Sequence, residues 1–161
     1  MADFEWELMA ALNRFFEIRE VRGVAYRLKQ SRYTSQVVDL LVDSPHSEYY
    51  MAIECKSIDA RKAKTLYFTQ HFSIAGGVHQ IQRADQFIER SGRQGILAVE
   101  LRRGPGKPKT AHLVPWKAVI EIFRSESPGL LVEDIEALPA LERKNGTYRI
   151  VAEDLLFSRS L

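Results

Sequence analysis

The sequence predicts a mixed α/β fold in which a central mixed sheet is flanked by helices. The apolar residues between positions 3 and 17 recur at helical spacing, whereas the segments 36–42 and 49–57 have the composition of strands buried in a sheet. A second helical stripe at 78–91 leads into an unbroken apolar run at 96–99. Helices that alternate with buried strands are typical of this fold class.

Composition and charge are those of an ordinary globular protein. Of the 161 residues, 45% are hydrophobic and 27% are charged, and the net charge of +2 does not by itself indicate a nucleic-acid partner. The single cysteine excludes a disulfide framework and a multi-cysteine zinc site. No apolar run approaches the roughly 18 residues of a membrane span, and the first residues lack a signal-peptide pattern. We expect a cytoplasmic protein with a core at 1–124 and a C-terminal extension at 125–161 packed on the same domain.

The first predicted helix carries two glutamates near its start. Asp3 suits the N-cap position of this helix. Glu5 lies three residues before Leu8 and therefore shares the apolar face or its margin, whereas Glu7 aligns with the outer side. If the helix contributes to a functional site, Glu5 is the better candidate. The alternative is that both glutamates only stabilise the helix dipole.

Charged residues within the two buried strands are the main indication of function. Asp39 interrupts the first strand, and Glu54 and Lys56 leave the same face of the second because they are two residues apart. A turn at 43–47 joins the strands into a hairpin, so Asp39 and Glu54 should lie near each other as offset neighbours. Burying an ionised carboxylate is unfavourable unless a partner or a metal ion neutralises it. These three side chains therefore predict a site.

Turn and cap residues predict the remaining elements. Gly76-Gly77 breaks the chain before the second helix, whose inner stripe includes Val78, and Gly92 suits its C-terminal cap. We interpret Gln80 and Gln82 as solvated polar residues of this helix, with assistance to the site as the alternative. The other predicted elements are strands at 24–28 and 111–114, a short extended piece at 66–68, a helix at 116–123 and a hairpin at 142–151 around Asn145-Gly146.

Charge is segregated along the chain. Residues 21–35 and 101–110 contain basic residues and no acid, whereas residues 36–54 and 125–142 contain acids and no lysine or arginine. Basic loops around an acidic centre suit a metal-dependent enzyme that acts on a polyanion. The alternative is a set of solvated loops on an average surface. We expect the acidic tail to be a dimer or partner element rather than a DNA surface.

The order helix, three strands, helix, strand, with these acids and this lysine, resembles the PD-(D/E)xK nuclease superfamily and, within it, archaeal Holliday junction resolvases. The resemblance covers roughly residues 3–123. It rests on Phe4-Glu5-Trp6-Glu7-Leu8, on Val38-Asp39-Leu40, on Ile53-Glu54-Cys55-Lys56-Ser57, and on the helix at 78–91 that leads into Ile96-Leu97-Ala98-Val99. It implies a restriction-endonuclease-like core. Val38 stands where the superfamily name has proline, and the tail has no clear counterpart.

The resemblance implies Mg²⁺-dependent hydrolysis of DNA phosphodiesters, with Mn²⁺ as a substitute ion and no small-molecule cofactor. Asp39 and Glu54 would be metal ligands, with the Cys55 carbonyl as a further oxygen ligand and Glu5 reaching the ion directly or through water. Lys56 would orient or help to deprotonate the attacking water, or stabilise the developing charge. The Cys55 side chain points to the opposite face and belongs to the core.

The resemblance also implies a structure-selective homodimer on branched DNA, because cutting two opposed strands requires two active sites. A serine before the acidic strand would assist the site, and Ser31 and Ser35 both qualify. The alternatives are another nuclease of this fold, acting in restriction or repair, and a DNA-binding protein of this fold that does not cleave. The residues expected to contact DNA are Arg27, Lys29, Ser31, Arg32, Ser35, Arg61, Lys62, Lys64, Arg102, Arg103, Lys107 and Lys109.

Overall fold

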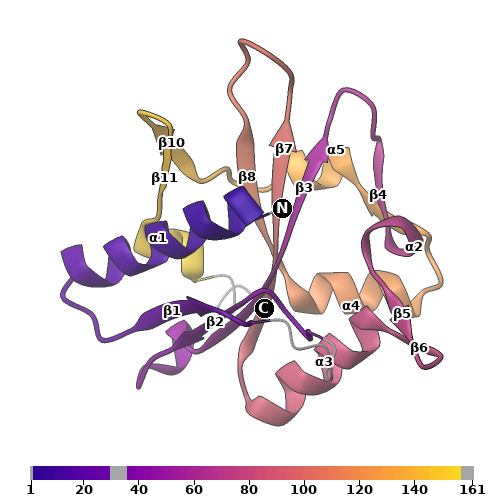
Figure 1. Ribbon diagram of the computed structural model, residues 1–161, viewed down its shortest axis with the longest axis horizontal. Helices are drawn as coiled ribbons and strands as arrows, with labels where there is room; N and C mark the ends of the chain where they lie inside the picture. Colours follow the sequence, from indigo (N-terminus) through magenta and orange to yellow (C-terminus); the bar gives the residue numbers. More distant parts are fainter. Residues whose placement is uncertain (1, 30–35, 157–161) are drawn as a thin grey trace.

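A five-stranded mixed sheet forms the centre of the computed structural model, which describes residues 2–29 and 36–156 (Figure 1). The strands follow the order β1-β2-β3-β7-β8, and only the β3–β7 pair is parallel among the neighbouring pairs of this sheet. The strands are β1 (Val24–Arg27), β2 (Leu40–Asp43), β3 (Met51–Asp59), β7 (Gln94–Arg102) and β8 (Thr110–Pro115). The predicted mixed α/β fold is confirmed.

Helices cover both faces of this sheet (Figure 1). One face packs against α1 (Ala2–Ile18), the hairpin of β10 (Glu142–Lys144) and β11 (Thr147–Arg149), and the short helix η2 (Ala152–Leu155). The other face packs against α2 (Phe68–His71), α3 (Gln80–Ser91), α4 (Trp116–Arg124) and α5 (Val132–Glu136). Because neighbouring residues of a strand point to opposite faces, Ile53 and Cys55 enter the first core, whereas Ala52 and Ile58 enter the second.

The inner face of α1 agrees with the helical spacing of its apolar residues. Leu8 is fully buried, and Glu5 is nearly so, as predicted. Two details differ. Asp3 lies inside the first turn of the helix rather than at its N-cap, because the helix already begins at Ala2. Glu7 was expected nearer the outside, but it is only partly exposed and pairs with basic side chains from other segments.

The pairing of β2 with β3 brings the two predicted acids close together. Leu40 pairs with Ile53, and the backbone N–H of Asp39 then donates to the Ile53 carbonyl at 3.1 Å, so Asp39 lies beside Glu54 at the point where the regular pairing ends. The connection between the two strands contains the short helix η1 (Ser47–Tyr49), which precedes β3. The first buried strand is shorter than expected, since β2 begins only at Leu40.

A small hairpin that the sequence did not predict precedes α3. Gly76 and Gly77 have φ angles of 58° and 77° and connect β5 (Ile74–Ala75) to β6 (Val78–His79). Positive φ at both central residues is the signature of a tight two-residue turn. Val78 is 41% exposed, so its predicted place in the inner stripe of the helix is wrong. Gly92, at φ 73°, ends α3 as predicted.

The residues after 125 complete both cores. The strand β9 (Gly129–Leu131) pairs with β4 (Thr65–Tyr67), and Val132 and Ile135 are buried beside it. Tyr148 of the predicted hairpin packs under α1, and Asn145 and Gly146 supply the positive φ angles of its turn. None of the helices within 2–29 and 36–156 is long and apolar enough to cross a membrane.

Candidate active site

Glu54 and Lys56 lie side by side on the face of β3 that α3 covers. Glu54 is 2% exposed, and its Oε2 is 3.4 Å from the Lys56 ammonium. The side-chain amide of Gln80, the first residue of α3, donates to the same Oε2 at 2.5 Å. The Lys56 ammonium also lies 4.6 Å from the centre of the Phe72 ring. The carboxylate and the ring therefore hold the ammonium in one place.

Asp39 joins this site from the end of β2. Its Oδ2 accepts a hydrogen bond from the backbone N–H of Cys55 at 2.7 Å, and its Oδ1 accepts one from the Gln36 side chain at 2.8 Å. The regular ladder of β2 begins at Leu40, so the Asp39 carboxylate serves as a partner for the backbone of β3 just beyond it. Asp39 is thereby fixed next to Glu54.

The electrostatics of the two acids are unfavourable without a further positive group. Burial raises the pKa of Glu54 well above its usual value, and the neighbouring Asp39 raises it further, whereas Lys56 acts in the opposite direction. Oε1 of Glu54 is buried and has no hydrogen-bond partner among the described residues. Adjacent carboxylates with an unsatisfied oxygen fit a hard divalent cation, which prefers oxygen ligands.

The other two predicted metal ligands have different surroundings. The Cys55 side chain is in the core, as predicted, and burial raises the pKa of its thiol. Glu5 forms an ion pair with Arg27, with nitrogen to Oε2 distances of 2.8 and 3.0 Å, and Arg27 also stacks 4.8 Å from the Trp6 ring. No group of three or more His, Cys, Asp or Glu residues in the described ranges is arranged to hold a metal ion. The side-chain donor set is thus the pair Asp39 and Glu54.

Gln80 belongs to the site, so its interpretation as a solvated helix residue is wrong. The helix begins directly beside Glu54, and this depends on the unpredicted hairpin before it. Gln82 instead accepts a hydrogen bond from the backbone of His79 and so helps to cap the helix. The available signal was a polar residue in the first turn of the helix that follows the acidic strands.

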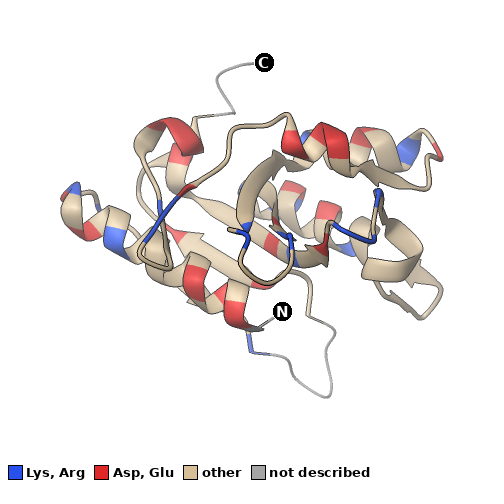
Figure 2. Ribbon diagram, turned by 90° about the horizontal axis from the view of Figure 1, so that it is seen from above, with Lys and Arg blue, Asp and Glu red and all other residues tan. Residues whose placement is uncertain are grey.

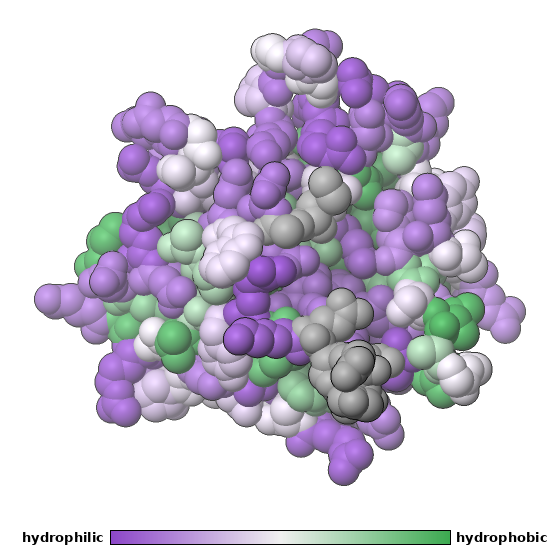
Figure 3. Space-filling view, in the orientation of Figure 1, coloured by the Kyte–Doolittle hydropathy of each residue, from purple (hydrophilic) through white to green (hydrophobic). Residues whose placement is uncertain are grey.

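The basic residues expected to contact DNA gather mainly at one end of the sheet (Figure 2). Arg27 is the exception because Glu5 engages it, and Lys29 is exposed just after β1. The face seen in Figure 3 is mostly hydrophilic, with hydrophobic residues in small separate groups. Ser31, Arg32 and Ser35 lie outside the described residues. The basic residues at this end of the sheet belong to two segments. Arg61, Lys62 and Lys64 lie on the turn after β3, and Arg102, Arg103, Lys107 and Lys109 lie on and beside the β7–β8 loop.

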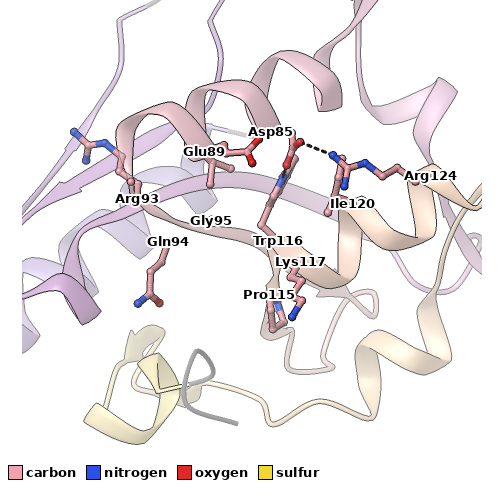
Figure 4. A pocket seen from close by; sticks show the side chains of 12 residues that line it. Asp85, Glu89, Arg93, Gln94, Gly95, Pro115, Trp116, Lys117, Ile120 and Arg124 are labelled. Atoms are coloured by element: carbon pink, nitrogen blue, oxygen red, sulfur yellow. Dashed lines mark hydrogen bonds and ion pairs between the residues drawn. The ribbon is translucent and has the colours of Figure 1, made fainter. Parts of the chain in front are cut away.

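A separate cavity of about 560 Å³ lies where α3 and α4 meet the start of β7 (Figure 4). Asp85 accepts hydrogen bonds there from the indole N–H of Trp116 and from Arg124, each at 3.1 Å. None of the residues predicted to act in catalysis lines this cavity. Both oxygens of Asp85 have donors there, and the cavity brings together no pair of carboxylates with an ammonium like that on β3, so the acidic site on β3 remains the better candidate for chemistry.

Comparison with known proteins gives a structural match only. No protein-family model matches the sequence, and no curated protein matches it. A matching solved structure is Hjc of Archaeoglobus fulgidus, a Holliday junction resolvase from an archaeal hyperthermophile. The match covers 89% of this chain and 87% of Hjc, with 15% sequence identity and a TM-score of 0.38. The chemistry of the site therefore follows from its own residues.

Proposed function

We propose that this protein is a metal-dependent endonuclease that hydrolyses DNA phosphodiesters at Asp39, Glu54 and Lys56. The observation that carries the proposal is the convergence of two adjacent carboxylates and one ammonium on a buried face of the sheet. Buried charges of this kind contribute little to stability compared with apolar packing. Their arrangement suits the chemistry of phosphate esters, which requires positive charge beside the phosphate and a positioned water.

Each side chain has a distinct role. Asp39 and Glu54 would hold Mg²⁺, or Mn²⁺ in its place, and the bound cation would polarise the phosphodiester and lower the pKa of a coordinated water. Gln80 positions Glu54 through its hydrogen bond to Oε2. Lys56 would orient the attacking water or stabilise charge on the phosphate oxygens. Glu5 would join only if its ion pair with Arg27 opened.

The reaction is a simple hydrolysis. The oxygen of water forms a bond to phosphorus, the bond from phosphorus to the leaving sugar oxygen breaks, and that oxygen takes up a proton. Among DNA substrates, the sequence resemblance favours four-way junctions. Paired cuts in opposed strands would then come from a homodimer, since its symmetry supplies two copies of the site.

The test is incubation of the purified protein and Mg²⁺ with a panel of labelled four-way junction, flap, duplex and single-stranded DNA. Paired symmetric nicks confined to the junction would support a resolvase. Cuts spread over the panel would support a nuclease of broader substrate range, acting in restriction or repair. A protein that binds these DNAs and cuts none of them in Mg²⁺ or Mn²⁺ would contradict the proposed activity and favour a DNA-binding role.

A further inference from the structure

A basic groove lies at the end of the sheet where β3 and β7 terminate. Its volume is about 510 Å³, and no acidic residue lines it. The lining cations come from three separate segments, namely the turn after β3, the β7–β8 loop region and the strand β10. Figure 2 looks onto this end of the molecule and shows basic residues on several neighbouring loops. The cations are Arg61, Arg102, Arg103, Lys107, Lys109 and Arg143.

Acids outside the lining hold four of these six cations. The N–O distances are 2.9 Å for Arg61–Asp59, 3.5 Å for Arg103–Glu136, 3.4 Å for Lys109–Glu100 and 2.9 Å for Arg143–Glu7. Arg102 and Lys107 have no acidic partner among the residues that the structure describes. The groove therefore combines several positioned donors with an excess of positive charge, which is the requirement for binding anions.

Glu100 organises the floor of the groove. It is 2% exposed, and its Oε1 accepts a hydrogen bond from the Ser57 hydroxyl at 2.8 Å while its Oε2 accepts one from the Tyr148 hydroxyl at 2.7 Å. The Ser57 oxygen in turn accepts from Nε of Arg102 at 3.1 Å. A buried carboxylate with donors on both oxygens joins β3, β7 and the C-terminal hairpin into one arrangement. The cations are therefore preorganised.

Gly104 also lines the groove. Its φ of 95° is a conformation that side-chain-bearing residues rarely adopt, and a Cβ at this position would lie 2.8 Å from Nη1 of Arg61. The close approach of the Arg61 guanidinium to this backbone joins the turn after β3 to the β7–β8 loop. The groove is thus a built feature that depends on contacts between its segments.

We infer that this groove binds successive phosphates of a nucleic-acid backbone, and that Arg143 makes the C-terminal hairpin part of the nucleic-acid surface. A row of backbone anions is the ligand that fixed cations from three segments fit best. Lys56 and Asp59 are three residues apart on β3, about 10 Å along the strand, and their side chains leave opposite faces of the sheet, so a DNA strand bound in the groove would pass around the end of the sheet to reach the candidate active site. The inference rests on the proposed function for its choice of DNA, and it departs from the expectation that the acidic tail avoids DNA.

Binding measured without divalent cations tests this inference separately from cleavage. Fluorescence anisotropy in EDTA, over a range of salt concentrations, gives the affinity and its salt dependence for junction and duplex DNA. The double variant Arg102→Gln, Lys107→Gln should bind more weakly, and the slope of log K against log salt should fall by about 2. Arg143→Gln should lower the slope by about 1. The double variant Arg90→Gln, Lys117→Gln removes the same charge from exposed positions outside the groove and should keep the wild-type slope.

A variant that should strengthen DNA binding, instead of weakening it, completes the test. Glu136→Gln removes the acid that pairs with Arg103 and should strengthen DNA binding. A wild-type slope in the groove variant, or an equal loss in the charge-matched control, would overturn the inference. Saturable binding of inorganic phosphate without any binding of DNA would also overturn it. Binding that depends on the groove without cleavage would leave the inference standing and would contradict only the proposed nuclease activity.

Discussion

A divalent cation should stabilise the folded protein through Asp39 and Glu54, and this effect can be measured without a nuclease assay. The perturbation is the addition of Mg²⁺ to metal-free protein at neutral pH. Under these conditions the two acids are adjacent, and Oε1 of Glu54 has no donor among the described residues. Because the unfolded chain does not hold the two carboxylates together, binding of the cation is coupled to folding.

The magnitude follows from the linkage relation and the size of the chain. At a free cation concentration of about 100 times Kd, binding adds about 2.7 kcal/mol to the free energy of unfolding. A chain of 161 residues has an unfolding entropy near the midpoint of about 0.34 kcal/mol/K from the per-residue average. The expected rise in Tm is therefore about 8 °C.

The assay is thermal unfolding, followed by calorimetry or intrinsic fluorescence, in EDTA and in increasing Mg²⁺ or Mn²⁺. Glu54→Gln should lose the rise in Tm, because a neutral amide replaces one of the two charged ligands. Glu133→Gln is the matched control, since it removes an exposed acid on α5 and should keep the full rise. A wild-type protein that does not respond to either ion, or an equal response in Glu54→Gln, would refute the reasoning.

Three further predictions follow from the same contacts. Since burial and Asp39 raise the folded-state pKa of Glu54, the contribution of Glu54 to metal-free stability should be fully present below the ordinary glutamate pKa and be lost as pH rises through the raised value. The difference between the urea midpoints of wild type and Glu54→Gln should show this slope, and parallel profiles of the two proteins would count against it. Gln80→Ala should raise the Mg²⁺ concentration needed for half of the Tm rise by about 10-fold to 100-fold, and it should leave the metal-free Tm nearly unchanged. An unchanged Mg²⁺ concentration at half of the rise would contradict the role of Gln80 in positioning Glu54. Gly95→Ala should cost about 1–3 kcal/mol in chemical denaturation, because its Cβ would lie 2.5 Å from Cβ of Trp116 and 2.6 Å from Cδ1 of Ile88; a neutral effect would contradict this packing.

The sequence was sufficient to predict the sheet residues of the candidate site. Glu54 and Lys56 share a face because strand geometry alternates side chains, and the hairpin brings Asp39 beside them. The exact pairing at Asp39, whose N–H donates to the Ile53 carbonyl, could not be predicted because hydrophobic alternation does not determine how many residues a connection uses. The pair of glycines before α3 carried an unused signal, since Gly-Gly with positive φ angles is typical of a two-residue hairpin turn.

Contacts between distant segments could not be predicted. Gln80 reaches Glu54 because α3 packs on the sheet with its first residue beside Glu54. The spacing of apolar residues within the helix does not determine that position. Arg143 reaches the groove because Tyr148 anchors its hairpin beneath α1 through the buried Glu100, a pairing across 48 positions of the chain. The ion pair of Glu5 with Arg27 is likewise a tertiary contact, and it gives that glutamate a partner which the helical pattern did not indicate.

Cleavage by matched variants tests the central claim most directly. Wild-type protein, Asp39→Asn and Lys56→Ala would be compared for Mg²⁺-dependent cutting of labelled four-way junction DNA, with binding of each measured in EDTA. We predict that both variants bind DNA about as well as wild type and that their cutting rate falls by about 100-fold or more, because each loses a group that acts on the phosphate or holds the cation. Cutting at the wild-type rate by either variant would contradict the assignment of the active site.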